Sequence, residues 1–204
     1  MSLLTIVQDI ALDVGLYGQA LPTSFSGATD RDSLELMNFI NKAGEEVARR
    51  VDWTALRNSI TLNGNGLPIT FALPSDFSRL ISGKAVSADG QAVRGGLSED
   101  EWADLPVSQG RPRFYKLSGK TIQFYPSLAF GSTVKVIYQS SNWNGSKAVF
   151  QFDGETALIP EIVISKVAIA RWRRQKGMTY DSYAAEAEQV MRDYADFDEG
   201  IRSP

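Results

Sequence analysis

Residues 67–80 read LPITFALPSDFSRL, in which a stiff corner, Leu73-Pro74-Ser75-Asp76-Phe77, separates two strand-like runs. Pro74 holds its own φ near about −65° and suits the start of a turn, and the Asp76 carboxylate can accept hydrogen bonds from nearby backbone. Phe77 is expected to return to the core. Because no obvious chemistry lies nearby for the corner to position, we interpret it as a rigid hinge between two pairs of strands.

Two hairpins are predicted around this corner. In SITLNGNGLPITF, residues 59–71, a turn at Asn63–Gly66 gathers on one face Ile60, Leu62, Leu67, Ile69 and Phe71. In RFYKLSGKTIQFYP, residues 113–126, a turn on Ser118-Gly119 gathers Tyr115, Leu117, Ile122 and Phe124. Apolar residues then alternate in a further strand that can extend the sheet of the second hairpin: Val134, Val136 and Tyr138.

The N-terminal part is predicted to form two helices. Apolar residues recur at helical spacing over residues 3–14, and Gly15 with Gly18 ends this first helix. A second, longer helix follows, with Asp30 or Asp32 as its cap. Its apolar stripe consists of Leu36, Ile40, Ala43, Val47 and Val51.

Two more helices are predicted at the C-terminal end. Pro160 suits the first position of one helix, which Gly177 ends. Asp181 or Ser182 caps a last helix, which ends at Gly200.

The order is therefore two helices, a block of strands and two helices. We predict an α+β fold with a single domain over residues 1–204. Residues 1–56 and 159–204 are expected to form an antiparallel helical bundle, and residues 57–158 an antiparallel β-sheet module inserted into it.

Composition bounds the chemistry of the chain. With 204 residues, 43% hydrophobic and 22% charged, the sequence is typical of a folded globular protein. It contains no His and no Cys, which excludes disulfides, Ser-His-Asp triads and HExxH zinc sites. An enzyme would have to use carboxylates, Lys, Tyr or a carboxylate-bound Mg²⁺. We therefore expect no enzyme activity.

Targeting and charge point to a cytoplasmic origin. The start, MSLLTIVQDIALDVGL, carries Asp9 and Asp13 and no basic region, so it is a poor signal peptide. No apolar stretch approaches the roughly 20 residues that span a bilayer, so no membrane partner is expected. The net charge of −3 argues against a protein that coats phosphate backbones.

Acidic residues cluster in SEDEWADL, residues 98–105. They are Glu99, Asp100, Glu101 and Asp104. Such a cluster can hold a divalent cation, but acids in the first turn of a short capped helix already favour the macrodipole, and we prefer that interpretation, with Trp102 turned inward. NGNG (63–66) and RGG (94–96) lack the strand-then-helix setting of a phosphate loop. No cofactor and no metal are expected.

Charged residues also line two predicted helices. The outer side of the second helix carries Glu35, Lys42, Glu45, Glu46, Arg49 and Arg50. In ARWRRQKG, residues 170–177, one helix end gathers Arg171, Arg173, Arg174 and Lys176. Solvated i,i+4 pairs and cations that complement the helix dipole explain both patterns. The alternative is a subunit interface or a DNA lumen, for which the candidates are Arg49, Arg50, Arg171, Arg173, Arg174 and Lys176.

Four stretches carry a further signal through their order along the chain. They are VARRVDWTALRNSITL (47–62), ITFALPSDFSRL (69–80), PRFYKLSGKTIQFYPSLAFGSTVKVIYQ (112–139) and IPEIVISKVAIARWRR (159–174). In this order they resemble the head-to-tail adaptor, or connector, proteins of tailed bacteriophages and prophage-derived particles. The resemblance covers the chain from Asp30 to about Tyr194.

The resemblance implies a structural ring subunit, usually one of twelve, docked under the portal protein in the neck of the virion. The implied partners are the portal, further copies of the chain, downstream tail or nozzle proteins, and double-stranded DNA in transit. Assembly would take place in the host cytoplasm. Portal contacts would lie in the last helix and tail, where the apolar anchors are Tyr194, Phe197 and Ile201.

Three alternatives remain open. One is another phage neck or tail component, a stopper or a terminator, which contacts the tail instead of the portal. Another is an enzyme acting through two carboxylates about 5–10 Å apart in a cleft. The third is a β-sheet module for sugar or peptide, which would expose aromatic side chains on one sheet face.

Overall fold

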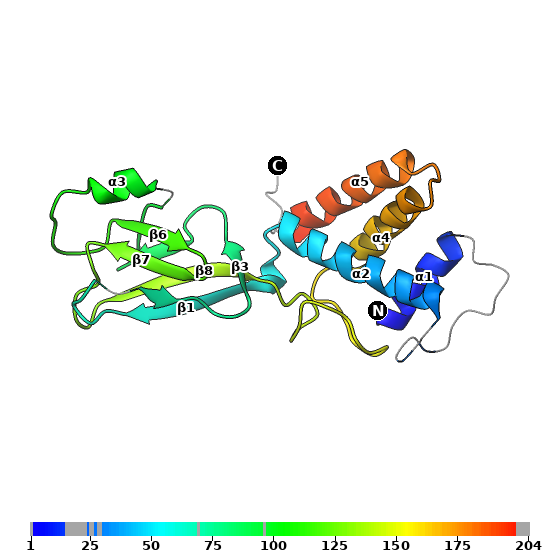
Figure 1. The fold of residues 1–204 in the computed structure, drawn as a ribbon, viewed down its shortest axis with the longest axis horizontal. Helices are drawn as coiled ribbons and strands as arrows, with labels where there is room; N and C mark the ends of the chain where they lie inside the picture. The colour runs from blue at the N-terminus through cyan, green and yellow to red at the C-terminus, as the bar shows by residue number, and fades with distance from the viewer. Residues whose placement is uncertain are drawn as a thin grey trace. The chain divides into compact units, whose positions relative to one another are not determined.

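The computed structural model describes residues 2–14, 24, 27, 30–68, 70–95 and 97–198. It divides the chain into two compact units, a helical unit of residues 1–56 with 141–204 and a β unit of residues 57–140 (Figure 1). Four helices belong to the first unit, and the strands with one short helix belong to the second. The α+β class predicted from the sequence is confirmed.

The helices of the helical unit are α1 (Leu3–Asp13), α2 (Arg31–Arg50), α4 (Glu161–Gln175) and α5 (Asp181–Asp198). Asp30 is the N-cap of α2, because its carboxylate accepts a hydrogen bond from the Ser33 backbone N–H at 2.9 Å. Hydrogen bonds from Ser33 also hold the pKa of Asp30 below its usual value. Pro160 is the N-cap of α4, one position before the predicted place. The glycines expected to end α1 and α5 lie outside the described residues.

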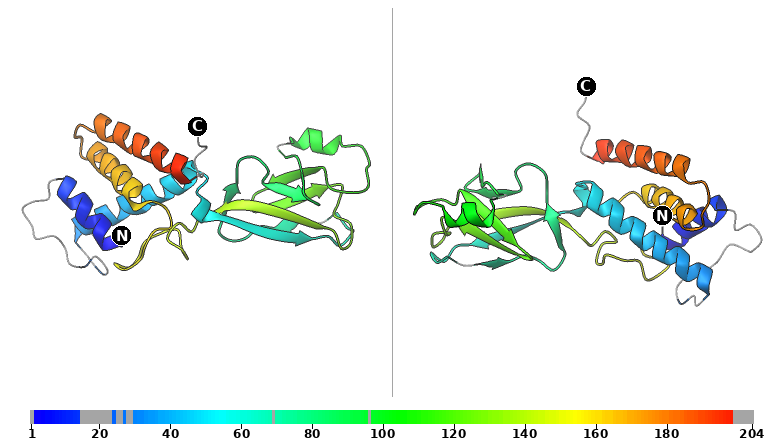
Figure 2. Two further views of the ribbon diagram at one scale, coloured as in Figure 1. Left: turned by 180° about the vertical axis from the view of Figure 1, so that it is seen from behind. Right: turned by 45° about the horizontal axis from the view of Figure 1, so that its top comes forward.

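Helix α4 contacts α1, α2 and α5, and Figure 2 shows these four helices side by side in two further views. Their shared core is formed by apolar faces, including Ile40 of α2 and Ile164 of α4. Gly44 permits the closest approach, because a Cβ atom there would lie 2.4 Å from a ring carbon of Trp143. The sequence pattern alone did not indicate this small residue as a packing requirement.

Residues 141–158 belong to the helical unit, whereas the expected β module extended to residue 158. Trp143 and Phe150 are buried in the helical core, with ring centroids 4.7 Å apart. The Asn41 side chain of α2 binds both backbone groups of Phe150, accepting from its N–H at 2.7 Å and donating to its carbonyl at 3.3 Å. The sequence pattern indicates no strand in this segment. Its aromatic side chains are buried in the core of the helical unit.

The β unit contains two antiparallel sheets. The larger one consists of β1 (Arg57–Asn63), β3 (Phe77–Leu80), β4 (Val86–Ala88), β5 (Gln91–Ala92) and β8 (Thr133–Ser140). The smaller one consists of β2 (Phe71–Ala72), β6 (Phe114–Ser118) and β7 (Thr121–Tyr125). Strand β8 pairs with β1, β3 and β4 and is therefore the centre of the larger sheet.

The hairpin predicted over residues 59–71 is wrong. Strand β1 pairs with β8, with Ile60 opposite Val136, and β2 pairs with β7. The loop after β1 turns toward the loop before β8, since the Gly64 N–H donates to the Ser132 carbonyl at 2.9 Å. A Cβ atom at Gly64 would lie 2.2 Å from the Ala129 carbonyl oxygen, so glycine permits this approach. Of the other residues assigned to the hairpin face, Leu67 is 61% exposed and Ile69 lies outside the described residues.

The strand pairing of the second predicted hairpin is confirmed, and its turn lies one residue later than predicted. Strands β6 and β7 pair with Leu117 opposite Ile122 and Tyr115 opposite Phe124, and the connecting residues are Gly119 and Lys120. Strand β8 does not extend this sheet, because it is the centre of the other one.

The short helix predicted in SEDEWADL is also confirmed, as α3 (Glu99–Ala103). Ser98 and Glu101 form a reciprocal capping box. Trp102 is half-buried, with its ring centroid 6.1 Å from that of Tyr125.

The corner at residues 73–77 joins the two sheets. The Phe77 N–H donates to the Pro74 carbonyl at 3.0 Å, and the chain passes from β2 in the smaller sheet to β3 in the larger one. The interpretation as a hinge between strand pairs is confirmed. Asp76 does not bind local backbone as expected; it accepts a hydrogen bond from the Tyr138 hydroxyl at 3.1 Å.

Candidate interaction surfaces

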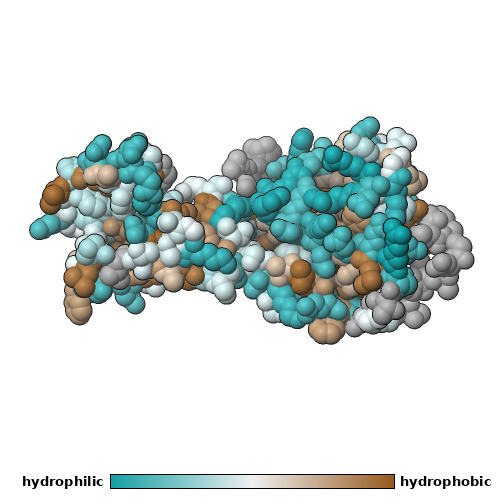
Figure 3. Space-filling model, in the orientation of Figure 1, coloured by the Kyte–Doolittle hydropathy of each residue, from teal (hydrophilic) through white to brown (hydrophobic). Residues whose placement is uncertain are grey.

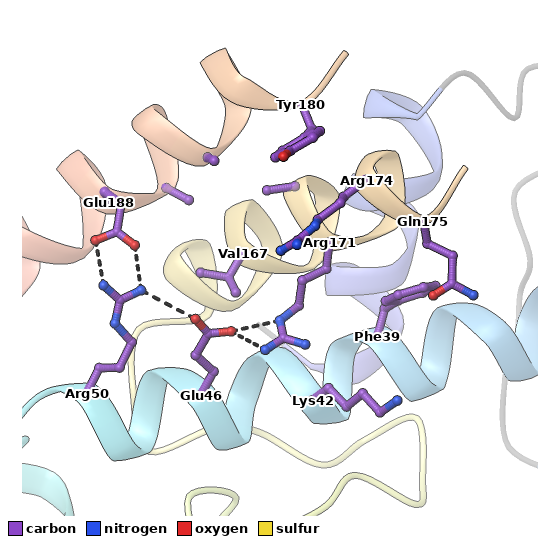
Figure 4. Close-up of a pocket in the computed structure, with 13 residues that line it drawn as sticks. Phe39, Lys42, Glu46, Arg50, Val167, Arg171, Arg174, Gln175, Tyr180 and Glu188 are labelled. Atoms are coloured by element: carbon purple, nitrogen blue, oxygen red, sulfur yellow. Dashed lines mark hydrogen bonds and ion pairs between the residues drawn. The ribbon is translucent and has the colours of Figure 1, made fainter. Parts of the chain in front are cut away.

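A groove of about 590 Å³ lies between α2, α4 and α5 of the helical unit (Figure 4). Helix α2 contributes Lys42, Glu46 and Arg50, spaced four residues apart on one face. The other charged residues that line it are Arg171, Arg174 and Glu188. Its apolar part includes Phe39, Val167, Ala184 and Ala187. The groove therefore combines a charged rim with an apolar floor.

Glu46 and Glu188 bind two of the cations in this groove. The Arg171 Nε donates to Glu46 at 2.7 Å, and its Nη2 donates to the same oxygen. Arg50 binds both oxygens of Glu188, at 2.5 and 2.6 Å, and reaches Glu46 at 3.4 Å. The three helices are thus joined by charge-assisted hydrogen bonds. The bond from Arg50 lowers the pKa of Glu188, and Glu188 raises the pKa of Arg50.

Lys42 and Arg174 complete the charged residues of the groove. No dashed line reaches either side chain in Figure 4, and among the described residues neither has a carboxylate within ion-pair distance. The Arg174 guanidinium lies 5.7 Å from the centroid of the Tyr180 ring. Sequence reasoning placed Lys42 on the charged side of α2 but did not choose it as a candidate, although its spacing from Glu46 and Arg50 was a usable signal.

The remaining cationic candidates lie outside the groove lining. Arg173 stacks on Tyr183 at 3.9 Å and donates to the Thr179 carbonyl at 3.2 Å. Lys176 binds Glu35 of α2 at 2.8 Å. Arg49 is exposed on α2. The structure therefore brings together Arg50, Arg171 and Arg174 and gives Arg173 and Lys176 partners elsewhere in the helical unit.

The end of α5 exposes two aromatic side chains. Tyr194 is 40% and Phe197 is 73% exposed, while Ala187 and Met191, earlier on α5, are buried. Asp198 is a hydrogen-bond acceptor for Thr54, from the backbone N–H at 2.6 Å and from Oγ1 at 2.7 Å. This carboxylate thus holds the end of α5 on the 3-10 turn at Thr54–Leu56. Ile201 lies outside the described residues.

The acidic cluster of α3 has structural partners. Glu101 closes the capping box, and its hydrogen bonds with Ser98 lower its pKa. Glu99 binds Lys116 of β6 at 2.5 Å. Across the part of the chain that the structure describes, no group of three or more acidic side chains is close enough to hold a metal ion.

The exposed apolar residues of the β unit lie mainly in loops. Leu67 lies in the loop after β1. Phe130, which is 88% exposed, lies in the loop before β8, and the two loops are hydrogen-bonded to each other. Among the described residues of this unit, Phe130 is the one exposed large aromatic side chain, so no row of aromatics lies on a sheet face. Figure 3 shows that hydrophilic side chains cover most of the visible face of the helical unit. No helix within the described ranges is both long and apolar enough to cross a bilayer.

Comparison with known families gives one match. The model of the family described as SU10 adaptor protein matches residues 1–204, which is the whole chain. No curated protein matches the sequence.

Proposed function

The chain belongs to the SU10 adaptor protein family, and from this premise we propose that it is one subunit of an oligomeric ring that joins the phage portal to the tail. The family is one of phage structural adaptors, so the chain is a structural component of the virion. In this role the chain lies in the neck and forms part of the conduit for double-stranded DNA. A twelve-fold ring is the expected form.

The exposed aromatic end of α5 carries this proposal. Phe197 is 73% exposed at the end of a helix whose earlier residue Met191 is buried. Aromatic side chains are enriched at the centres of protein interfaces, because they bury a large area at a small cost in side-chain entropy. Tyr194 lies one turn before Phe197 on the same side of α5. We assign the portal contact to this pair, which we call the aromatic end of α5.

The charge distribution supports a conduit that does not hold DNA tightly. The chain has a net charge of −3, and Arg50, Arg171 and Lys176 are bound to carboxylates of the same unit. Phosphate contacts by unpaired cations would resist the movement of the genome through a ring. A largely neutralised basic surface permits DNA to pass.

Co-sedimentation with purified portal rings tests the portal contact. The double variant Tyr194→Ala/Phe197→Ala should bind about 30-fold more weakly, because loss of a pair of central aromatic anchors typically costs about 2 kcal/mol. Its melting temperature should match that of the wild type, since both side chains are exposed. Phe152→Ala is the matched control, because Phe152 is an exposed aromatic residue of the same unit outside α5.

Undiminished portal binding by the double variant would remove the aromatic end of α5 from the interface. Wild-type protein that binds purified tail components but no portal would instead identify a stopper or a terminator.

A further inference from the structure

We propose that the groove between α2, α4 and α5 binds an acidic face of a second copy of the chain, in which Asp193 and Asp196 of the partner subunit pair with Lys42 and Arg174. The inference rests on the proposed ring and assigns its subunit contact to particular residues.

The groove has an excess of positive charge. Four cationic and two anionic side chains line it, and both carboxylates already bind Arg50 and Arg171. Lys42 and Arg174 therefore account for the net positive charge of the groove. The Arg174 guanidinium lies at cation–π distance from the Tyr180 ring, and Lys42 projects from the backbone of α2.

The same chain carries a complementary face at the other end of α5. Asp193 and Asp196 are exposed and three residues apart, so they share one side of the helix. Asp193 accepts a hydrogen bond from Gln189 at 2.7 Å. Neither carboxylate forms an ion pair within the described ranges, although five of the last six residues of α5, 193–198, are Asp or aromatic. Among the described residues, no cation pairs with this face.

The composition of the groove favours a protein segment over DNA. The apolar floor of Val167, Ala184 and Ala187 can receive aliphatic or aromatic groups, which a phosphate backbone does not carry. A carboxylate-bearing helix offers both kinds of contact. The groove and the acidic face lie at different positions on α5, so the contact is heterologous, the kind that closes into rings.

The acidic face leaves the proposed portal contact free. Successive residues of a helix are separated by about 100°, so the side of Asp193 and Asp196 differs from that of Tyr194 and Phe197 by about that angle. One helix end can therefore contact a neighbouring copy and the portal together. Exposed ion pairs are weak singly, so this contact should be transient between free chains at high concentration and stable when several copies are held side by side.

Cysteine crosslinking tests the contact directly, because the chain has no native Cys. Asn38→Cys lies one turn before Lys42, and Gln189→Cys one turn before Asp193, so all four charged residues are retained. Full-length Asn38→Cys and Gln189→Cys chains are mixed at high concentration with a short bismaleimide. The mixed dimer should exceed that of the control pair Gly154→Cys with Gln189→Cys by about tenfold, because docking raises the effective concentration of the thiols.

Charge reversal then identifies the residues. Lys42→Glu/Arg174→Glu in the Asn38→Cys chain should remove the excess crosslink, and Asp193→Lys/Asp196→Lys in the Gln189→Cys chain should restore it. Arg31→Glu, an exposed cation elsewhere on α2, should change nothing. Equal crosslinking at the control site, or charge reversal without effect, would overturn the inference. Portal binding by the wild type is measured separately and tests the proposed function. The subunit contact can therefore be disproved while the portal contact stands, and the reverse.

Discussion

Two carboxylates of the helical unit determine how its basic residues are used. Glu46 binds Arg171 and Arg50, and Glu188 binds Arg50 through both oxygens. The Glu46–Arg171 and Arg50–Glu188 pairs join different helices and are tertiary contacts, whereas Glu46–Arg50 is an i,i+4 pair within α2. Arg50 and Arg171, which the sequence suggested as a partner surface, therefore contribute to the packing of α2, α4 and α5. Lys42 and Arg174 are the cations of the groove that remain available to a ligand.

Glu188→Gln should lower the free energy of unfolding by about 0.5–1 kcal/mol at pH 7, because the Arg50 pair is partly solvent-screened. The pKa of Glu188 is lowered in the folded protein, so the stabilisation is present above the unfolded pKa of about 4.3 and is lost as the pH falls through the folded-state pKa. Urea denaturation at pH 7 and below pH 4.3 measures the difference.

Glu45→Gln provides the control for this measurement, since Glu45 is an exposed residue of the same helix α2 outside the groove. It should leave stability almost unchanged at both pH values. A deficit of Glu188→Gln that persists unchanged in acid would contradict the ionic origin of the effect.

At the scale of elements, the hinge at residues 73–77 organises the β unit. It ends β2 in the smaller sheet and begins β3 in the larger one, so one turn sets the relation between two hydrogen-bonded layers. Phe77 stacks on Tyr138 of β8 at 5.6 Å between ring centroids, and the Tyr138 hydroxyl binds Asp76. The turn is therefore attached to the central strand through both a ring contact and a hydrogen bond.

Phe77→Ala should destabilise the β unit by about 2 kcal/mol, below the roughly 3–5 kcal/mol typical of a fully buried Phe, because Phe77 is only half-buried. Chemical denaturation measures this loss. Phe130→Ala, at an 88% exposed position of the same unit, should cost little. Wild-type stability in Phe77→Ala together with lost portal binding would identify Phe77 as an interface residue.

At the scale of the whole molecule, the chain is a structural adaptor of the phage virion, and its chemistry is that of assembly. The family match extends over residues 1–204, so both units belong to the adaptor. The surfaces assigned above, the aromatic end of α5 and the charged groove, lie in the helical unit. Their contacts are small, and small contacts become stable when a template holds many copies together.

The free chain should therefore be a monomer at micromolar concentration and form a ring only on the portal. Sedimentation velocity of the chain alone, and negative-stain imaging after addition of portal, measure the two states. A stable free dimer that persists after portal is added would contradict templated assembly.

Local patterns in the sequence determined much of this fold. The cap at Asp30, the capping box of Ser98 and Glu101, the hairpin at residues 113–126 and the hinge at Pro74 were all predictable. In each case the interacting groups are separated by only a few residues, so residue type and spacing specify the hydrogen bonds. The absence of His and Cys likewise limited the chemistry without any structure.

Long-range choices needed the tertiary structure. Alternation in β1 is satisfied equally by β2 or by β8, and the fold selects β8, whose residue Val136 lies opposite Ile60. Arg50 and Glu188 are separated by 138 positions, so their pairing has no local signature. Which cations are neutralised, and which remain in a groove, depends on helix packing, because side chains distant in sequence meet only after the core has formed.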